Sequence, residues 1–139
     1  MLIDADRDQL ILAMVAFDEA SDQGQDGIRA QIWSVLNRHA AGKWYSRKTL
    51  AGTCLLSWQY SALNNGDPNR ERGAEVSLQD PTYQMCQLEV LRALSGITKD
   101  PVFGATHYYA DGTDIPAWAY APAIFTIQIG KHRFYRNVQ

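Results

Sequence analysis

The first part of the chain is dominated by an apolar run that ends in two carboxylates. Residues 10–17 are apolar without interruption, and Asp18 and Glu19 follow them directly. A helix that is apolar on every side is typically buried in a globular protein. We therefore predict a buried helix over residues 5–20, with Glu19 at the point where this helix leaves the core.

A second helix is predicted over residues 26–39. Apolar side chains recur there at helical intervals and form one buried stripe: Ile28, Ile32, Val35 and Leu36. The preceding segment, residues 21–27, is polar and contains two glycines, so it ends the first helix. After residue 39 the pattern is less regular, and Ser46 is a candidate cap for a short helix.

A third long helix is predicted over residues 80–95. Asp80 is a preferred N-cap residue, and Pro81 suits the first position of a helix. The apolar residues of this helix recur at intervals of three: Met85, Leu88, Leu91 and Leu94. Gly96 is expected to end the helix in the left-handed conformation that glycine adopts easily.

After Gly96 the helical pattern gives way to aromatic and β-branched residues. Strands are predicted over residues 106–109, 124–129 and 132–136, with Gly130 in a tight turn between the last two. Helices followed by a small antiparallel sheet indicate an α+β fold. The length is typical of one domain, so we expect residues 1–139 to form a single catalytic domain.

Composition and charge argue against several classes of protein. The chain is 46% hydrophobic and 20% charged, which is ordinary for a globular protein. The net charge of −2 is unevenly spread, because residues 1–26 carry seven acids and one base, whereas residues 27–59 carry five bases and no acid. Neither block is dense enough for a nucleic-acid site. The apolar run is too short to span a bilayer and follows acidic residues, so we expect neither a membrane helix nor a signal peptide.

No metal or other cofactor is expected. His39, His107 and His132 are scattered along the chain, without the paired spacing that zinc enzymes use. Cys54 and Cys86 lie in apolar-leaning segments, and we expect both to be reduced residues of the core.

Six short blocks follow one another between residues 16 and 136. They are Glu19-Ala20 at a helix end, Val35-Leu36-Asn37-Arg38, Gln59-Tyr60-Ser61, Asp100-Pro101 with Gly104-Ala105-Thr106-His107-Tyr108-Tyr109, Trp118, and Ile129-Gly130-Lys131-His132-Arg133-Phe134-Tyr135-Arg136. In content and order these blocks resemble the catalytic domain of the cell-wall hydrolases typified by the spore cortex-lytic enzyme SleB. Two features depart from that family: Asp18 replaces a small residue, and the polar insert near residues 64–79 is long.

The resemblance implies a lysozyme-like, transglycosylase-like helical core with a small antiparallel sheet near the C-terminus. It implies peptidoglycan glycan strands as substrate, cleaved at the β-1,4 bond from N-acetylmuramic acid to N-acetylglucosamine. Glu19 would be the general acid, since a partly buried carboxyl group has a raised pKa and keeps its proton. Asp18 lies about 100° around the helix from Glu19, and Asp22 lies at or beyond the helix end. The lack of a compelling second carboxylate favours a lytic transglycosylase over a hydrolytic muramidase.

Seven further residues are expected to bind substrate: Gln59, Tyr60, Ser61, His107, Tyr108, Tyr109 and Trp118. Pyranose faces pack on aromatic rings, and hydroxyl and amide groups bind sugar hydroxyls or N-acetyl groups. Strand alternation places His107 and Tyr109 on one face of the sheet and Tyr108 on the other, so at least one of them belongs to the core. An equally good interpretation of Gln59 and Ser61 is that they are a helix cap and its neighbour and do not bind substrate.

The biological setting stays open at this level. A small wall-cleaving enzyme without an export signal suits a bacteriophage endolysin, made in the host cytoplasm and released to the cell wall. A prophage-encoded or virion-carried lysin is nearly as well supported. Two other classes remain: a zinc-dependent N-acetylmuramoyl-L-alanine amidase, and a non-catalytic wall-binding or virion module. We expect a monomer that binds no nucleic acid and does not insert into membranes.

Overall fold

The computed structural model describes residues 4–56 and 79–139. Within these residues the helices come first: α1 (Asp4–Ala20), α2 (Gly24–Ala40), α3 (Leu50–Leu55) and α5 (Pro81–Leu94). They are followed by three strands and a short 3-10 helix: β1 (His107–Ala110), η2 (Ala117–Ala119), β2 (Ile124–Ile129) and β3 (His132–Arg136). This order confirms the predicted α+β class. None of the described helices is long and apolar enough to cross a membrane.

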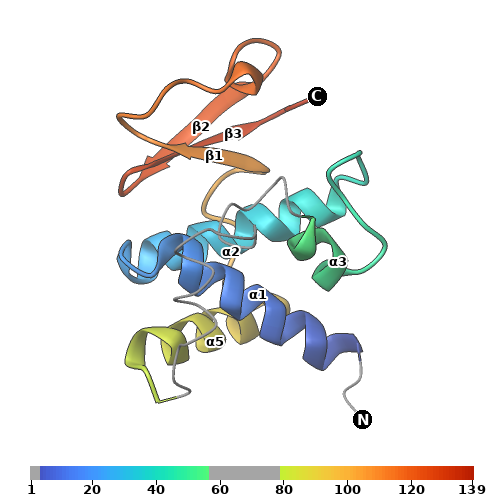
Figure 1. Ribbon diagram of the computed structural model, residues 1–139, viewed down its shortest axis with the longest axis vertical. Coiled ribbons are helices and arrows are strands. Elements are labelled where there is room, and N and C mark those ends of the chain that lie inside the picture. The colour runs from blue at the N-terminus through green and yellow to red at the C-terminus, as the bar shows by residue number, and fades with distance from the viewer. Residues whose placement is uncertain (1–3, 57–78) are drawn as a thin grey trace.

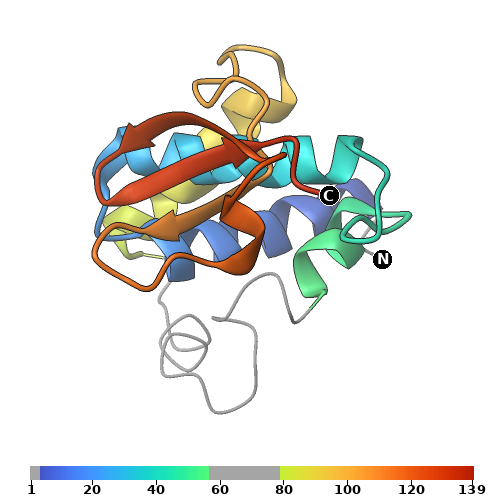
Figure 2. The same cartoon turned by 90° about the horizontal axis from the view of Figure 1, so that it is seen from above.

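The sheet lies on α2, and α1 and α5 pack against α2 and against each other on the side away from the sheet (Figure 1). α1 packs against α2, α3 and α5. The view onto the sheet in Figure 2 shows that no described α-helix lies over its outer face, on which Trp118 of the short helix η2 packs. We call the face toward α2 the inner face and the opposite one the outer face.

The sheet is antiparallel, and β3 lies between β1 and β2. Tyr108 of β1 is paired with Phe134, while Phe125 of β2 is paired with Tyr135. Gly130, in the turn between β2 and β3, has a φ of +59°, a left-handed conformation that favours glycine. The predicted hairpin is therefore confirmed.

The main core lies among the four helices. It contains most of the apolar run of α1 and the apolar stripe of α2: Leu12, Ala13, Val15, Ala16, Phe17, Ile28, Ile32 and Val35. Cys54 and Cys86 belong to the same core as free thiols, as predicted, and burial raises the pKa of each to about 12. A second apolar cluster joins α2 to the inner face of the sheet through Ala30, Trp33 and Phe134.

The buried face of α5 differs from the predicted one. All four residues of the predicted stripe are exposed: Met85, Leu88, Leu91 and Leu94. The buried residues are displaced around the helix: Tyr83, Cys86, Glu89, Val90 and Ala93. Glu89 can be buried because Arg29 Nε lies 2.7 Å from its Oε1, and Arg92 Nη1 lies 2.7 Å from its Oε2. The prediction used the spacing of apolar residues alone, so it could not include a buried carboxylate whose partner Arg29 is distant in the sequence.

The predicted ends of α5 are confirmed, whereas the predicted cap of the short helix is wrong. Asp80 Oδ1 accepts hydrogen bonds from two backbone N–H groups of the first turn of α5, and Gly96 has a φ of +75°. α3 is capped by the side chain of Thr49 instead of Ser46. The hydroxyl of Ser46 donates to the backbone oxygen of Arg38 and so holds the loop after α2.

Candidate active site

Glu19 lies in the last turn of α1, where the helices meet the sheet. Its side chain is half-buried, and the hydroxyl of Tyr108 donates a hydrogen bond to Glu19 Oε2 at 3.3 Å. Tyr108 comes from β1, so this pair connects the end of the buried helix to the inner face of the sheet. The preceding residues of α1 pack in the core, and this packing places Glu19 at the border between the helices and the sheet.

Two residues of β3 fix the ring of Tyr108. Its centroid lies 4.8 Å from that of His132 and 5.4 Å from that of Phe134. Both neighbours are buried, and burial followed by the nearby charge of Lys131 lowers the pKa of His132. His132 is therefore a neutral aromatic neighbour near pH 7, and the phenol of Tyr108 is held with little freedom.

The two acids nearest to Glu19 in the sequence, Asp18 and Asp22, lie in different surroundings. Asp18 is only 5% exposed. Asp22 is exposed, and its Oδ2 accepts a hydrogen bond from Lys131 Nζ at 2.8 Å. This bond, with a further one from Gln23, lowers the pKa of Asp22 to about 2. Gln23 Oε1 in turn accepts from the backbone N–H of Lys131 at 3.0 Å, so this segment ties the end of α1 to the β2–β3 turn.

Three of the predicted substrate-binding residues meet on the outer face of the sheet. The ring of Trp118 lies 5.1 Å from that of His107 and 6.0 Å from that of Tyr109. Tyr108 faces the other way, toward Glu19, so the predicted alternation in this strand is confirmed. The predicted residues thus form two groups on opposite faces of the sheet.

His107 is the most enclosed member of the outer group. Its ring packs at 4.8 Å from that of Tyr45, and its Nδ1 lies 2.8 Å from the hydroxyl oxygen of Thr106. Burial, with smaller effects of Arg38 and Lys43, lowers the pKa of His107 to about 3. The imidazole is therefore neutral near pH 7, and the half-buried Trp118 and Tyr109 are the members of this group that solvent reaches.

The remaining predicted residues, Gln59, Tyr60 and Ser61, lie outside the described residues. Of the positions that the structure does describe, Glu19 and Tyr108 are brought into contact, whereas His107, Tyr109 and Trp118 contact one another.

A family model described as Cell Wall Hydrolase matches residues 22–135. The chain belongs to the cell wall hydrolase family. The matched region contains α2, α3, α5 and the sheet up to Tyr135, and it begins three residues after Glu19. Comparisons with curated proteins and with solved structures find no match. The resemblance noted in the sequence is thereby confirmed at the level of the family, and the activity that follows is degradation of peptidoglycan.

Two residues of α2 in this cell wall hydrolase hold the segment that leads into β1. Arg38 Nε donates to the backbone oxygen of Thr106 at 2.9 Å, and Asn37 Nδ2 donates to that of Ala105 at 3.0 Å. Asn37 also binds the carboxylate of Asp100. These contacts are all with the segment that leads into the strand of Tyr108, so the Asn37-Arg38 pair orients that strand.

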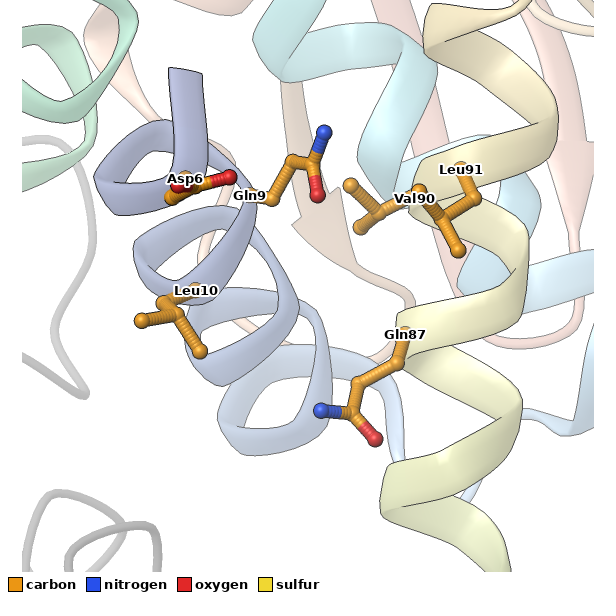
Figure 3. Close-up of a pocket in the computed structure, with 6 residues that line it drawn as sticks. All are labelled: Asp6, Gln9, Leu10, Gln87, Val90 and Leu91. Atoms are coloured by element: carbon orange, nitrogen blue, oxygen red, sulfur yellow. The ribbon is translucent and has the colours of Figure 1, made fainter. Parts of the chain in front are cut away.

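Two hollows of the cell wall hydrolase are lined by residues other than Glu19. The first, of about 310 Å³, lies between α1 and α5 (Figure 3), and its lining is Asp6, Gln9, Leu10, Gln87, Val90 and Leu91. The second, of about 270 Å³, is more open and is lined by Phe103, Phe125, Thr126 and Arg136. Residues of the second hollow, together with Tyr135 and Arg133, were not singled out in the sequence as single binding positions. The available signal was the pairing of aromatic and arginine residues near the ends of the strands, Phe125 in β2 and Tyr135 and Arg136 in β3.

Proposed function

We propose that this cell wall hydrolase cleaves the β-1,4 bond from N-acetylmuramic acid to N-acetylglucosamine as a lytic transglycosylase. Glu19 acts first as the general acid and then as the general base. The observation that carries the proposal is the Glu19–Tyr108 pair, a half-buried carboxyl group at the end of a buried helix with a phenol donor at 3.3 Å. A site of this kind is suited to proton transfer, because the carboxyl group is partly desolvated and is held in place.

The reaction proceeds by two proton transfers through the same carboxyl group. Protonated Glu19 donates its proton to the glycosidic oxygen as the bond from C1 of the muramic acid to that oxygen breaks. The Glu19 carboxylate then removes the proton of the sugar's own 6-hydroxyl, whose oxygen bonds to C1 and closes a 1,6-anhydro ring. The N-acetylglucosamine leaves with a free hydroxyl, Glu19 regains its proton, and no water is consumed. Tyr108 stabilises the intervening carboxylate by donating to Oε2.

The state of the neighbouring acids supports this reaction over hydrolysis. A hydrolytic muramidase uses a second carboxylate as base or nucleophile. Asp18 is buried, and Asp22 is held by Lys131. A transglycosylase needs neither group, because the substrate supplies the attacking hydroxyl.

We further propose that the enzyme acts in host cell lysis as a bacteriophage or prophage endolysin, made in the cytoplasm and reaching the wall through a membrane hole. Degradation of peptidoglycan is the activity that such lysis requires. Expression in a bacterial host with and without a hole-forming partner tests this role. Lysis should require both the partner and an intact Glu19, and lysis by the enzyme alone would contradict it.

Mass spectrometry of the fragments released from purified peptidoglycan tests the reaction, with Glu19→Gln and Asp26→Asn in parallel. Asp26 is an exposed acid in the first turn of α2 and serves as the matched control. Fragments lighter by one water than hydrolysed muropeptides, absent only with Glu19→Gln, are expected. Reducing-end fragments of full mass would indicate a muramidase, and free stem peptides an amidase. Binding without any fragments would indicate a non-catalytic wall-binding module.

A further inference from the structure

The outer face of the sheet carries a continuous group of aromatic rings around Tyr135. The ring of Tyr109 is stacked on that of Tyr135 with centroids 5.7 Å apart and planes inclined by 21°. The rings of Trp118 and Phe125 meet Tyr135 edge-on, at 5.5 and 5.6 Å. We call these four residues the outer aromatic face: Tyr109, Trp118, Phe125 and Tyr135.

Solvent reaches three of the four residues of the outer aromatic face, which surround the buried Tyr135. The inner face of the sheet packs on α2, whereas no described α-helix lies over the outer face, which is contacted by Trp118 of η2 (Figure 2). Phe125 is 43% exposed, and Tyr109 and Trp118 are half-buried. Soluble proteins seldom leave a contiguous group of large apolar side chains in water unless the group binds something.

Polar groups are placed among these rings. The guanidinium of Arg133 lies 4.5 Å above the ring of Phe125 and donates to the side-chain oxygen of Gln128 at 3.2 Å. The hydroxyl oxygens of Tyr109 and Tyr135 lie 3.4 Å apart. Aromatic rings bordered by hydroxyl, amide and guanidinium groups can bind both the apolar face and the hydroxyls of a pyranose.

The outer aromatic face continues into the open hollow of about 270 Å³, because Phe125 also lines that hollow with Phe103 and Arg136. Phe103 is 61% exposed, and its φ of +55° lies in the left-handed region that residues other than glycine rarely adopt. Its backbone oxygen accepts a hydrogen bond from Arg136 Nη1 at 3.4 Å. A strained backbone that presents an aromatic ring to solvent points to function at this end of the sheet.

We infer that the outer aromatic face and this hollow form a second saccharide-binding surface, which holds the intact glycan strand of peptidoglycan at a distance from Glu19. The inference rests on the proposed function in taking peptidoglycan glycan as the ligand. Tyr108 and Tyr109 point to opposite faces of the sheet, so one pyranose ring cannot contact the Glu19 site and the outer aromatic face together. A polymer that passes the edge strand β1 can contact both.

The chemistry of the surface favours this polymer over an uncharged glycan. Muramic acid residues carry peptides with carboxylates, and Arg133 and Arg136 supply two guanidinium groups at the surface. The surface should therefore increase affinity for polymeric peptidoglycan without being needed for cleavage of a fragment that fills only the Glu19 site.

Sedimentation with insoluble peptidoglycan tests the inference, using the Glu19→Gln background so that the polymer is preserved. Phe125→Ala with Arg133→Ala should bind about tenfold more weakly, because an aromatic platform and a cation are removed. Leu88→Ala with Lys99→Ala is the matched control, since it removes an equally exposed apolar residue and a cation from a different part of the surface. Equal binding of the two double variants would overturn the inference.

A second measurement does not depend on the stability of the variants. Titration of the unmodified chain with a soluble N-acetylglucosamine tetramer is followed by NMR of the indole N–H signals, assigned with Trp118→Phe and Trp44→Phe. The Trp118 signal should shift strongly, whereas that of Trp44, which is linked to Trp118 only through the rings of Tyr45 and His107, should shift much less. An unmoved Trp118 signal would also overturn the inference.

The two proposals fail in distinguishable ways. If Glu19→Gln still releases fragments, the proposed reaction is wrong. Sedimentation on ice, where cleavage is slow, would still measure binding to the second surface. Removing the stem peptides from the polymer separates the contribution of the arginine to binding from that of the aromatic rings. The effect of Arg133→Ala should then disappear, while that of Phe125→Ala remains. Loss of both effects would assign the surface to the peptides and overturn the glycan site.

Discussion

The hydroxyl of Tyr108 donates a hydrogen bond to the carboxylate of Glu19 at 3.3 Å, although 89 residues separate them in the chain. One partner is at the end of a core helix, and the other is on an edge strand of the sheet. The candidate active site therefore exists only where α1 and the sheet meet, and neither element contains it alone.

Tyr108→Phe tests this relationship with the loss of one oxygen atom. We expect kcat for release of muropeptides to fall roughly tenfold or more, because a hydrogen bond to a charged group is lost. KM should change little, since the ring and its packing are kept. Tyr109→Phe is the matched control, because it removes a hydroxyl from the outer face and should leave kcat on short fragments unchanged. Equal kcat values for the two variants would contradict the proposed role of the pair.

Asp22→Asn separates the two possible reactions of a glycosidase. Asp22 and Lys131 are both largely exposed, so we expect a loss in unfolding free energy of less than about 1 kcal/mol. Activity should be retained, since a transglycosylase takes its nucleophile from the substrate. Loss of fragment release in a variant that melts normally would instead assign Asp22 to catalysis and favour a muramidase.

Replacement of Glu89 should destabilise the fold more than any surface change. The side chain is fully buried and is bound by Arg29, Arg92 and Gln25. Glu89→Ala leaves Arg29 without its partner, and we expect a loss of about 3–5 kcal/mol in unfolding free energy, measured by urea denaturation. Asp26→Ala, on the exposed side of α2, provides the comparison. Similar losses for both would show that the buried network contributes little.

The same carboxylate predicts a dependence of stability on pH. Burial alone would raise the pKa of Glu89, but the hydrogen bonds from Arg29, Gln25 and Arg92 outweigh it and lower the pKa from 4.5 to about 2. A lowered pKa in the folded state stabilises the fold above the unfolded value, and this contribution is lost as the pH falls. Unfolding free energy should therefore decrease between pH 4.5 and about 2 in the native chain, and this part of the decrease should be absent in Glu89→Gln.

Two neighbouring residues of α5 test which face of that helix is buried. Val90 is almost fully buried, whereas Leu91 is 47% exposed. Val90→Ala should cost about 1–3 kcal/mol through lost packing, and Leu91→Ala should change stability by less than about 0.5 kcal/mol. Thermal unfolding of the two variants measures the difference. A larger loss of stability for Leu91→Ala than for Val90→Ala would show that the face predicted from the sequence is the buried one.

Much of the fold follows from rules that act over a few residues. Asp80 and Gly96 mark the ends of α5 through capping, and Gly130 marks the hairpin through its positive φ. Strand alternation likewise placed Tyr108 and Tyr109 on opposite faces. These features were predictable because the groups that determine them are close in sequence.

Other features depend on partners that are distant in the chain. Glu89 is buried because Arg29, 60 residues earlier, approaches it, and no local pattern contains that information. The site divides between two faces of the sheet because α2 packs on only one of them. Alternation predicted two faces, but it could not predict which of them would meet Glu19.

The sheet is joined to the helices at both ends of the candidate site. Arg38 binds the chain just before β1, and Lys131 at the opposite tip binds Asp22 and Gln23 just beyond the end of α1. Glu19 and Tyr108 lie between these two attachments. Because the sheet is attached to the helices on both sides of this pair, we expect the two parts not to move apart or together when substrate binds. Recognition should then depend on the fit of an extended polymer to a site whose geometry is already fixed, with little reorganisation of the protein at each cleavage.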